Sequence, residues 1–266
     1  VEDVVKALMH ILWYERAKVL EVTMDFSESM HSIVKQCFPY ATITIDRFHV
    51  QKDCYDAMQQ VRIKHRREAQ RAEMEAREQH KLRNKKNAEA RKKRLAKNGG
   101  KRKGKQGRKP NRKNEKYEPV RLSNGDTVCE LLTRSRYLLM TSADKWTASQ
   151  KIRARLLFEL YPKIKEAYNL VDSLRAIFRN KTIDRNQAGT KLHEWYQKVA
   201  DSTLREVKSA RDSIREKEDE VLNYFINRST NAAAESLNSK IKHFRSQLHG
   251  VSDLPFFIYR LTVIFG

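Results

Sequence analysis

Residues 20–27 of the chain read Leu20-Glu21-Val22-Thr23-Met24-Asp25-Phe26-Ser27. A short run of β-branched and apolar residues stops at the carboxylate of Asp25, and the serine that follows has the type of side chain that caps helices. We therefore predict a buried strand that ends at Asp25, followed by a helix from Glu28 to Phe38. Asp25 would then lie at the carboxyl end of a strand, where open α/β sheets hold their ligands.

A second unit of the same kind follows, because residues 41–50 read ATITIDRFHV and place Asp46 at the end of another apolar run. Two parallel strands joined by a helical crossover put Asp25 and Asp46 on the same edge of the sheet. Either acid alone is most often a helix cap or a turn residue. The pair within one strand–helix–strand unit indicates a metal or catalytic site.

The composition points to a helical protein with a polyanionic partner. The 266 residues include 55 Lys and Arg against 33 Asp and Glu, a net charge of +22. The mean hydropathy is −0.77, and there are only 8 Gly and 5 Pro. Few helix breakers and many charges predict long solvated helices. A charge of this size is typical of proteins that bind nucleic acid.

The sequence does not indicate a disulfide-bonded, membrane-spanning, secreted or zinc-binding protein. The three cysteines show no CxxC spacing and suit a reduced, cytosolic chain. No apolar run approaches the roughly 20 residues of a membrane span, and no signal peptide is visible. The eight histidines form neither an HExxH motif nor a zinc spacing. No Ser/His/Asp or Cys/His arrangement indicates nucleophilic catalysis.

Apolar periodicity predicts helices through most of the remaining chain. The expected helical stretches are residues 1–19, 51–79, 131–140, 148–178, 192–199 and 204–225, with Trp146 and Trp195 in the core. Residues 254–265 are expected to close the core as a helix or a strand. The periodicity fades after Arg62, so residues 62–79 are expected to form a solvated helix that resembles a coiled-coil segment.

Residues 81–116 are the most basic part of the chain. They contain 18 Lys and Arg against two acids, which leaves +16 of the total charge in this segment. The middle, residues 98–110, cannot bury a core and is expected to be disordered when free. We interpret the segment as a flexible arm that neutralises phosphates, and a solvated linker is the alternative. The predicted DNA contacts in this arm are Lys101, Arg102, Lys103, Lys105, Arg108 and Lys109.

Residues 231–246 predict a helix, capped by Thr230 or Asn231, that carries a third carboxylate. Asn231, Glu235, Asn238 and Lys242 are spaced so that they share one helical face. Leu237 and Ile241 are expected to face the core. One face thus offers a carboxylate, two amides and a cation, which suits binding of a metal ion and a phosphate backbone. A solvated polar face is the alternative.

Several of these motifs resemble those of the ISL3-family transposases, which are DDE enzymes with a ribonuclease-H-like fold. The resemblance lies in residues 22–27, residues 45–50, residues 230–242, and the ending Gln247-Leu248-His249-Gly250 with Phe256 shortly after. It covers most of the chain and is weakest in the basic arm, which we interpret as an insertion.

The resemblance implies an α/β fold of few parallel strands, a ribonuclease-H-like fragment that is interrupted by a large α-helical insertion and is mostly helical overall. Residues 1–60 and 227–266 would form the ribonuclease-H-like part, 61–122 the charged helix and arm, and 123–226 the insertion. The first catalytic Asp of the family belongs on a strand upstream of Val1, so we expect this chain to lack that acid together with the first β-hairpin and the N-terminal DNA-binding part.

The resemblance further implies that Asp25 and Glu235 are the second and third catalytic acids. They would bind Mg²⁺ or Mn²⁺, with Asp46 as a further ligand or a residue behind the ligands. Two ions roughly 4 Å apart would activate a water or a 3′-OH for cleavage and transfer of DNA strands. The partners would be transposon ends and target DNA, contacted by Arg47, His49, Asn231, Asn238, Lys240 and Lys242. Neither a membrane nor a small-molecule substrate is implied.

The family resemblance also implies a cytoplasmic, nucleoid-associated bacterial protein, and the sequence leaves open whether it acts as a homodimer. Two alternatives to the enzyme remain. A truncated or repurposed transposase would bind DNA without cutting it, and the missing first acid favours that alternative. A structural coiled-coil protein would fit residues 62–79 but would leave both strand-end acids unexplained.

Overall fold

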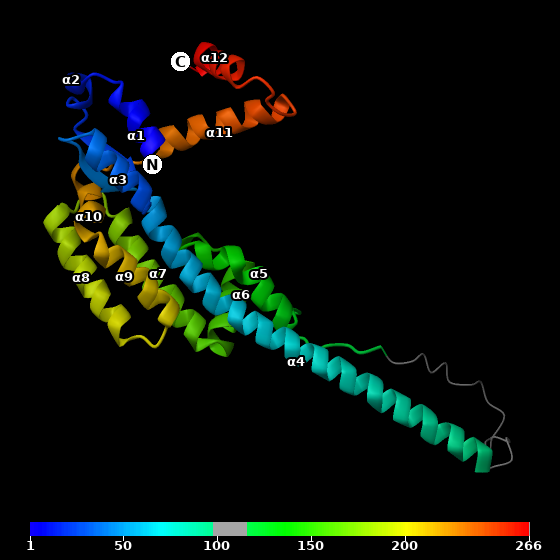
Figure 1. Cartoon of the computed structure of the whole chain (residues 1–266). Coiled ribbons are helices and arrows are strands. Elements are labelled where there is room, and N and C mark those ends of the chain that lie inside the picture. The colour runs from blue at the N-terminus through cyan, green and yellow to red at the C-terminus, as the bar shows by residue number, and fades with distance from the viewer. Residues whose placement is uncertain (98–115, 266) are drawn as a thin grey trace. The chain divides into compact units, whose positions relative to one another are not determined.

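The computed structural model describes residues 1–97 and 116–265 (Figure 1). Most of these residues are helical, and two short strands pair in one parallel sheet. The elements in chain order are α1 Glu2–Met9, α2 Trp13–Arg16, β1 Glu21–Met24, α3 Glu28–Cys37, β2 Thr42–Ile45, α4 Arg47–Lys97, α5 Val128–Met140, the 3₁₀ helix η1 Ala143–Lys145, α6 Ala148–Leu160, α7 Pro162–Arg179, α8 Arg185–Asp201, α9 Arg205–Glu216, α10 Glu218–Asn227, α11 Ala232–Gln247 and α12 Leu254–Phe265.

The chain forms two compact units. The first consists of Val1–Tyr55 with Leu170–Gly266, and the second of Asp56–Asn169. The first unit contains both strands and all the predicted catalytic residues. The four regions predicted from composition and resemblance remain predictions, and the stretch 98–110 with its six predicted DNA contacts lies outside the described residues.

The predicted strand–helix–strand unit is confirmed. Strands β1 and β2 are parallel and in register from Glu21 opposite Thr42 to Met24 opposite Ile45. The N–H of Asp46 donates to the carbonyl of Met24 at 2.8 Å, which extends the ladder one residue beyond the strands. Ser27 caps α3 as predicted, since its Oγ accepts a hydrogen bond from the N–H of Met30 at 3.3 Å.

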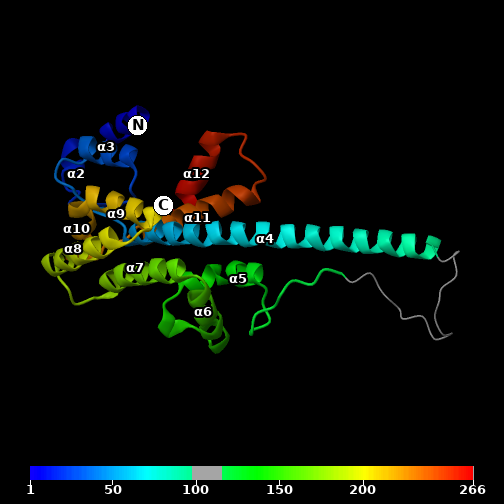
Figure 2. The ribbon, with the colours of Figure 1, turned by 90° about the horizontal axis from the view of Figure 1, so that it is seen from below.

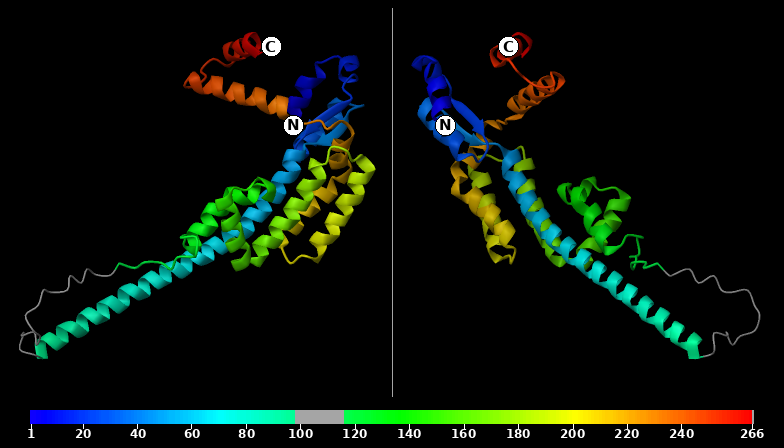
Figure 3. Two further views of the ribbon diagram at one scale, coloured as in Figure 1. Left: turned by 180° about the vertical axis from the view of Figure 1, so that it is seen from behind. Right: turned by 45° about the vertical axis from the view of Figure 1, so that its right-hand side comes forward.

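Helix α10 covers the outer edge of β2. Residues 42 and 46 donate hydrogen bonds toward β1, so the backbone groups of Ile43 point to the opposite edge. There the carbonyl of Ile43 accepts a hydrogen bond from Nδ2 of Asn223 at 2.8 Å. Figure 3 shows α10 lying against the strands. A side-chain amide thus takes the place that a further strand would occupy.

Helices α8, α9 and α10 pack against one another in the first unit (Figure 2). Trp195 of α8 is 1% exposed, and its Nε1 donates to the carbonyl of Leu170 at 2.8 Å. Phe178 lies 5.2 Å from Phe225 and 5.8 Å from Tyr224, measured between ring centroids. The core role predicted for Trp195 is therefore confirmed.

Polar contacts join α4 to α5 in the second unit. The guanidinium of Arg62 is buried and donates to the carbonyl of Leu132 at 2.7 Å, while Gln59 donates to the carbonyl of Arg136 at 3.0 Å. Trp146 is half-buried and lies 5.3 Å from the ring of Tyr168. It belongs to the hydrophobic core of this unit, as predicted.

Three stretches that were predicted as continuous helices are broken. Residues 1–19 form α1 and the short α2, residues 148–178 are divided at Tyr161, and residues 204–225 are divided at Lys217. Pro162 begins a new helix because its ring fits the first helical position but cannot continue the helix before it. The apolar stripe stays in phase across that break, which is why periodicity alone missed it.

The prediction of a flexible arm beginning at Lys81 is wrong for residues 81–97. Helix α4 runs without a break from Arg47 to Lys97. Residues 81–97 contain Lys, Arg, Ala and Glu but neither Gly nor Pro, and these side chains favour a helix even when nothing packs against it. The basic charges of this part therefore lie along a helix.

The core role predicted for residues of the last two helices is largely wrong. Leu237 of α11 is 42% exposed, and no residue of that helix is buried. Phe257 is buried in α12 and stacks on Phe244 at 5.9 Å, but Leu254 and Phe256 are more than half exposed. Periodicity shows which face of a helix is apolar, but it does not specify a partner to cover that face.

Within residues 1–97 and 116–265, the structure contains no helix with both the length and the apolar character needed to cross a membrane.

Candidate functional site

Asp25 stands at the end of β1, as the sequence predicts. Its side chain is partly buried, and Oδ1 accepts a hydrogen bond from the N–H of Ser27 at 3.0 Å. No donor within the described part of the chain reaches Oδ2. One carboxylate oxygen thus shapes the turn into α3, and the other is available to a ligand.

Asp46 stands at the end of β2 beside Asp25, and it is 3% exposed. Its Oδ1 accepts the N–H of Phe48 at 2.6 Å, and its Oδ2 accepts the N–H of Asn231 at 2.6 Å. The second of these bonds joins residues 185 positions apart in the sequence. Because both carboxylate oxygens accept backbone N–H groups, Asp46 connects the sheet to the start of α11.

Glu235 lies one turn into α11 and is brought to the same end of the sheet. Its N–H donates to the carbonyl of Asn231 at 2.9 Å, and the N–H of Asn231 in turn donates to Asp46. Its Oε1 lies 3.7 Å from Nε2 of His49, on the first turn of α4. The Glu235 side chain is 56% exposed and that of His49 is 24% exposed. The carboxylate is therefore open to solvent on one side.

Glu21 contacts the segment before α11, a role that was not predicted from the sequence. Its Oε1 accepts the hydroxyl of Thr44 at 2.7 Å, and its Oε2 accepts the amide of Asn227 at 3.0 Å and the hydroxyl of Ser229 at 2.9 Å. Burial raises the pKa of Glu21, but these three hydrogen bonds outweigh it and leave the pKa below its ordinary value. The sequence signal that could have identified Glu21 is an acidic residue inside a short, otherwise apolar strand.

The predicted DNA contacts divide into three groups. His49 and Asn231 join the contacts around Asp46 and Glu235, while Arg47 is exposed and lies over the ring of Tyr224 at 5.8 Å. Three others are exposed on α11: Asn238, Lys240 and Lys242. The six arm residues, Lys101, Arg102, Lys103, Lys105, Arg108 and Lys109, lie outside the described residues.

The described residues do not form a complete metal site by themselves. Among them, no group of three or more His, Cys, Asp or Glu side chains could hold a metal ion. Asp46 uses both oxygens for backbone N–H groups, which leaves Asp25 and Glu235 with free carboxylate oxygens. Two carboxylates suit Mg²⁺, because that ion is commonly bound by one or two carboxylates together with water and substrate phosphates.

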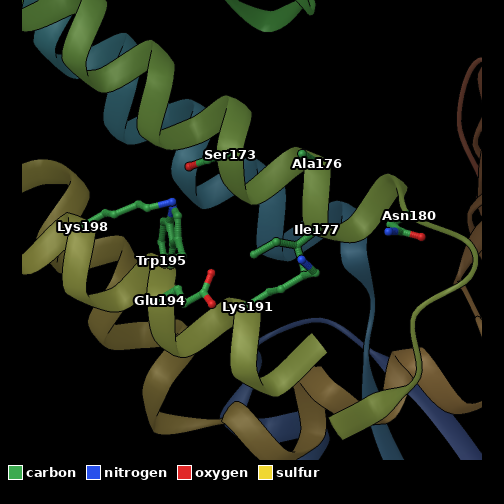
Figure 4. A pocket seen from close by; sticks show the side chains of 8 residues that line it. All are labelled: Ser173, Ala176, Ile177, Asn180, Lys191, Glu194, Trp195 and Lys198. Carbon is green, nitrogen blue, oxygen red and sulfur yellow. The ribbon is translucent and has the colours of Figure 1, made fainter. Parts of the chain in front are cut away.

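A hollow of about 300 Å³ lies elsewhere in the first unit, between α7 and α8 (Figure 4). Lys191, Glu194 and Lys198 of α8 line it opposite Ser173 and Asn180. None of the predicted site residues lines this hollow. It is therefore separate from the candidate site.

The comparisons with known proteins identify the family. The family model of the ISL3 DDE transposases, described as a transposase, matches residues 2–261. The chain belongs to the ISL3 family of DDE transposases. Neither a curated protein nor a solved structure matches it.

The match of this ISL3 transposase covers both compact units, so the family includes the strands, the helices between them and the helix of Glu235. Transposition of DNA is the general function of such proteins, and DNA is the partner that this function implies. The resemblance found in the sequence motifs is therefore confirmed at the level of the family.

Proposed function

We propose that the chain is the catalytic region of a transposase that cuts and joins DNA strands with the help of a divalent ion, with Asp25 and Glu235 as catalytic carboxylates. Membership of the family supports this proposal together with one set of contacts. The backbone bond from Asp46 to Met24, the bond from Asn231 to Asp46 and the helical bond from Glu235 to Asn231 link the two acids through the end of the sheet.

The proposal includes a ribonuclease-H-like core. The pair of parallel strands with a helical crossover agrees with part of such a sheet. In this arrangement α10 closes the edge of β2, so further strands would pair with the other edge of β1. The first acid of the family would come from one of those strands.

In the reaction, a water molecule or the 3′-OH of a cut strand attacks a phosphorus atom of DNA, and the bond from phosphorus to the 3′ oxygen breaks. The attacking oxygen loses its proton to solvent as the new bond to phosphorus forms, and the departing oxygen takes up a proton from solvent. The carboxylates of Asp25 and Glu235 would present free oxygens at the place of reaction, and His49 lies 3.7 Å from Oε1 of Glu235. Lys240 and Lys242 on α11 are exposed and would bind phosphates of the strand.

Mg²⁺ or Mn²⁺, when bound by these two carboxylates, would supply positive charge that stabilises the transferring phosphate. Carboxylate oxygens are the hard ligands that these ions prefer. Substrate phosphates and water would complete the ligand set.

Strand cleavage tests the proposal. The substrate is a DNA duplex taken from the sequence that flanks the gene, incubated with the full-length protein and Mg²⁺. We expect Glu235→Gln and Asp25→Asn to abolish cleavage without loss of DNA binding, because each keeps the size of the side chain and removes its charge. Glu194→Gln on α8 is the matched control and keeps wild-type cleavage. Retained cleavage in Glu235→Gln would refute the role of that residue.

A second function is favoured by one observation, namely that no group of three or more His, Cys, Asp or Glu side chains among the described residues could hold a metal ion. A repurposed transposase that binds DNA without cutting it would fit this arrangement. The same assay separates the two functions: the binding protein shows salt-sensitive DNA affinity but no cleavage in any divalent ion, for wild type and variants alike.

A further inference from the structure

Two carboxylates of the sheet hold the connector between α10 and α11, which we define as residues 228–231. Glu21 accepts hydrogen bonds from Asn227, directly before the connector, and from Ser229 within it. Asp46 accepts the backbone N–H of Asn231 at its end. The strands therefore bind both ends of a short segment that leads directly into the helix of Glu235.

The bond to Asp46 fixes the first turn of α11. Asn231 is the N-cap residue of this helix, but its own side chain makes no capping hydrogen bond. The buried carboxylate of Asp46 accepts the Asn231 N–H instead, and a negative charge there is stabilised by the positive end of the helix dipole. Four residues later, the N–H of Glu235 donates to the carbonyl of Asn231.

We propose that Glu21 and Asp46 are positioning residues, which hold the start of α11 so that Glu235 faces Asp25 at the end of the sheet. This inference rests on the proposed function. It assigns to Asp46 a role other than the metal ligand predicted from the sequence, because both of its oxygens accept backbone N–H groups. His49 Nε2 lies 3.7 Å from Oε1 of Glu235 and borders the carboxylate on one side.

A pair of variants at Asn231 separates the two roles of Asp46. Asn231→Pro removes the N–H that Asp46 accepts but leaves the carboxylate of Asp46 intact. The φ angle of Asn231 is −76°, which proline adopts without strain. Asn231→Ala is the matched control, because it removes the same side chain and keeps the N–H. Asp46→Asn leaves one oxygen to accept the two N–H groups.

The first readout is amide hydrogen exchange of residues 232–240 in the full chain, which requires no activity. A lost hydrogen bond to a charged acceptor corresponds to exchange that is roughly 10- to 100-fold faster. We expect this increase in Asn231→Pro and in Asp46→Asn, and wild-type exchange in Asn231→Ala. Asp184→Asn changes a similar carboxylate cap, on α8, and serves as a second control without effect on residues 232–240.

The second readout is cleavage of the flanking DNA duplex. We expect kcat to fall about tenfold or more in Asn231→Pro relative to Asn231→Ala, with the same KM for DNA, since the two variants lack the same side chain. Glu21→Gln is expected to lower kcat as well, because the amide offers one acceptor oxygen where the carboxylate offers two.

Three results decide the matter. Wild-type exchange in Asn231→Pro overturns the holding role of Asp46. Faster exchange in that variant with the kcat of Asn231→Ala overturns the positioning of Glu235. If the full-length wild-type protein cleaves no DNA, the proposed function fails, and the exchange data alone then decide whether Asp46 holds α11.

Discussion

A row of lysines on α4 offers a quantitative test of how this transposase binds DNA. Lys85 and Lys92 are seven residues apart and share one face of the helix, and Lys86 and Lys93 form a parallel row beside them. All four are exposed. We expect their replacement by glutamine to remove four phosphate contacts without breaking the helix, because glutamine favours helices about as well as lysine.

The size of the effect follows from the release of counterions. Each phosphate contact contributes about 0.9 to the slope of log affinity against log salt, so four contacts contribute roughly 3.6. Between 50 and 200 mM salt, which is a fourfold change, this slope corresponds to about a 150-fold difference in affinity. When the salt is raised from 50 to 200 mM, the DNA affinity of the wild-type chain should therefore fall about 150-fold more than the DNA affinity of the variant.

The assay is fluorescence anisotropy with a labelled DNA duplex at several salt concentrations between those limits. The control replaces four other exposed lysines and so changes the net charge equally: Lys151, Lys163, Lys165 and Lys181. Circular dichroism checks that both variants keep their helices. Equal salt slopes in the two variants would refute the reasoning, because then net charge alone, and not the row on α4, would determine binding.

Two further predictions concern the second unit. Asp126, which is 2% exposed, accepts hydrogen bonds from Arg134 and from Arg153; burial raises its pKa, but the two arginines outweigh burial and lower it below the ordinary value. Asp126→Asn should therefore lower the free energy of unfolding by about 2–3 kcal/mol near pH 7, and this loss should shrink below about pH 4 as the wild-type carboxylate is protonated. Thermal melts of both proteins near pH 7 and below pH 4 measure the loss. The same stability difference between wild type and variant at both pH values would contradict the prediction. Burial, with the carboxylate of Glu73, raises the pKa of the Cys129 thiol to about 11. Labelling of Cys129 by iodoacetamide should be slow at pH 8 and faster in Glu73→Gln, and equal rates would refute the influence of Glu73.

The sequence predicted the local parts of the site correctly. The strand residues, the cap at Ser27 and the placement of Asp25 beside Asp46 all depend on residues close together in the chain, and the structure confirms them. The same holds for the helix that carries Glu235. Its start at Asn231 follows from the polar residues before an alanine run.

The role of Asp46 could not be predicted from the sequence. Its partner is the backbone N–H of Asn231, 185 residues later, and a backbone group leaves no trace in residue types. The contacts of Glu21 with Asn227 and Ser229 could not be predicted either, because polar residues before a helix are common and do not indicate a distant partner. Both contacts join the strands to a connector that lies far away in the sequence.

The exposed faces of α11 and α12 show a second limit. Leu237 and Phe256 lie on apolar positions, and the sequence therefore predicted core residues. Burial depends on a neighbour as well as on hydrophobicity, and the described residues cover little of these helices. In contrast, the continuation of α4 to Lys97 was within reach of helix propensity, because no Gly or Pro interrupts it.

The central claim is that Asp25 and Glu235 share a divalent ion. It is tested most directly by measuring, with electron paramagnetic resonance, how tightly Mn²⁺ binds to the full-length protein in complex with DNA. We expect Asp25→Asn and Glu235→Gln each to weaken Mn²⁺ binding by about tenfold or more, and the double variant to be little weaker than either, because one ion needs both ligands. Wild-type Mn²⁺ affinity in either single variant, or two losses that simply add, would contradict the claim.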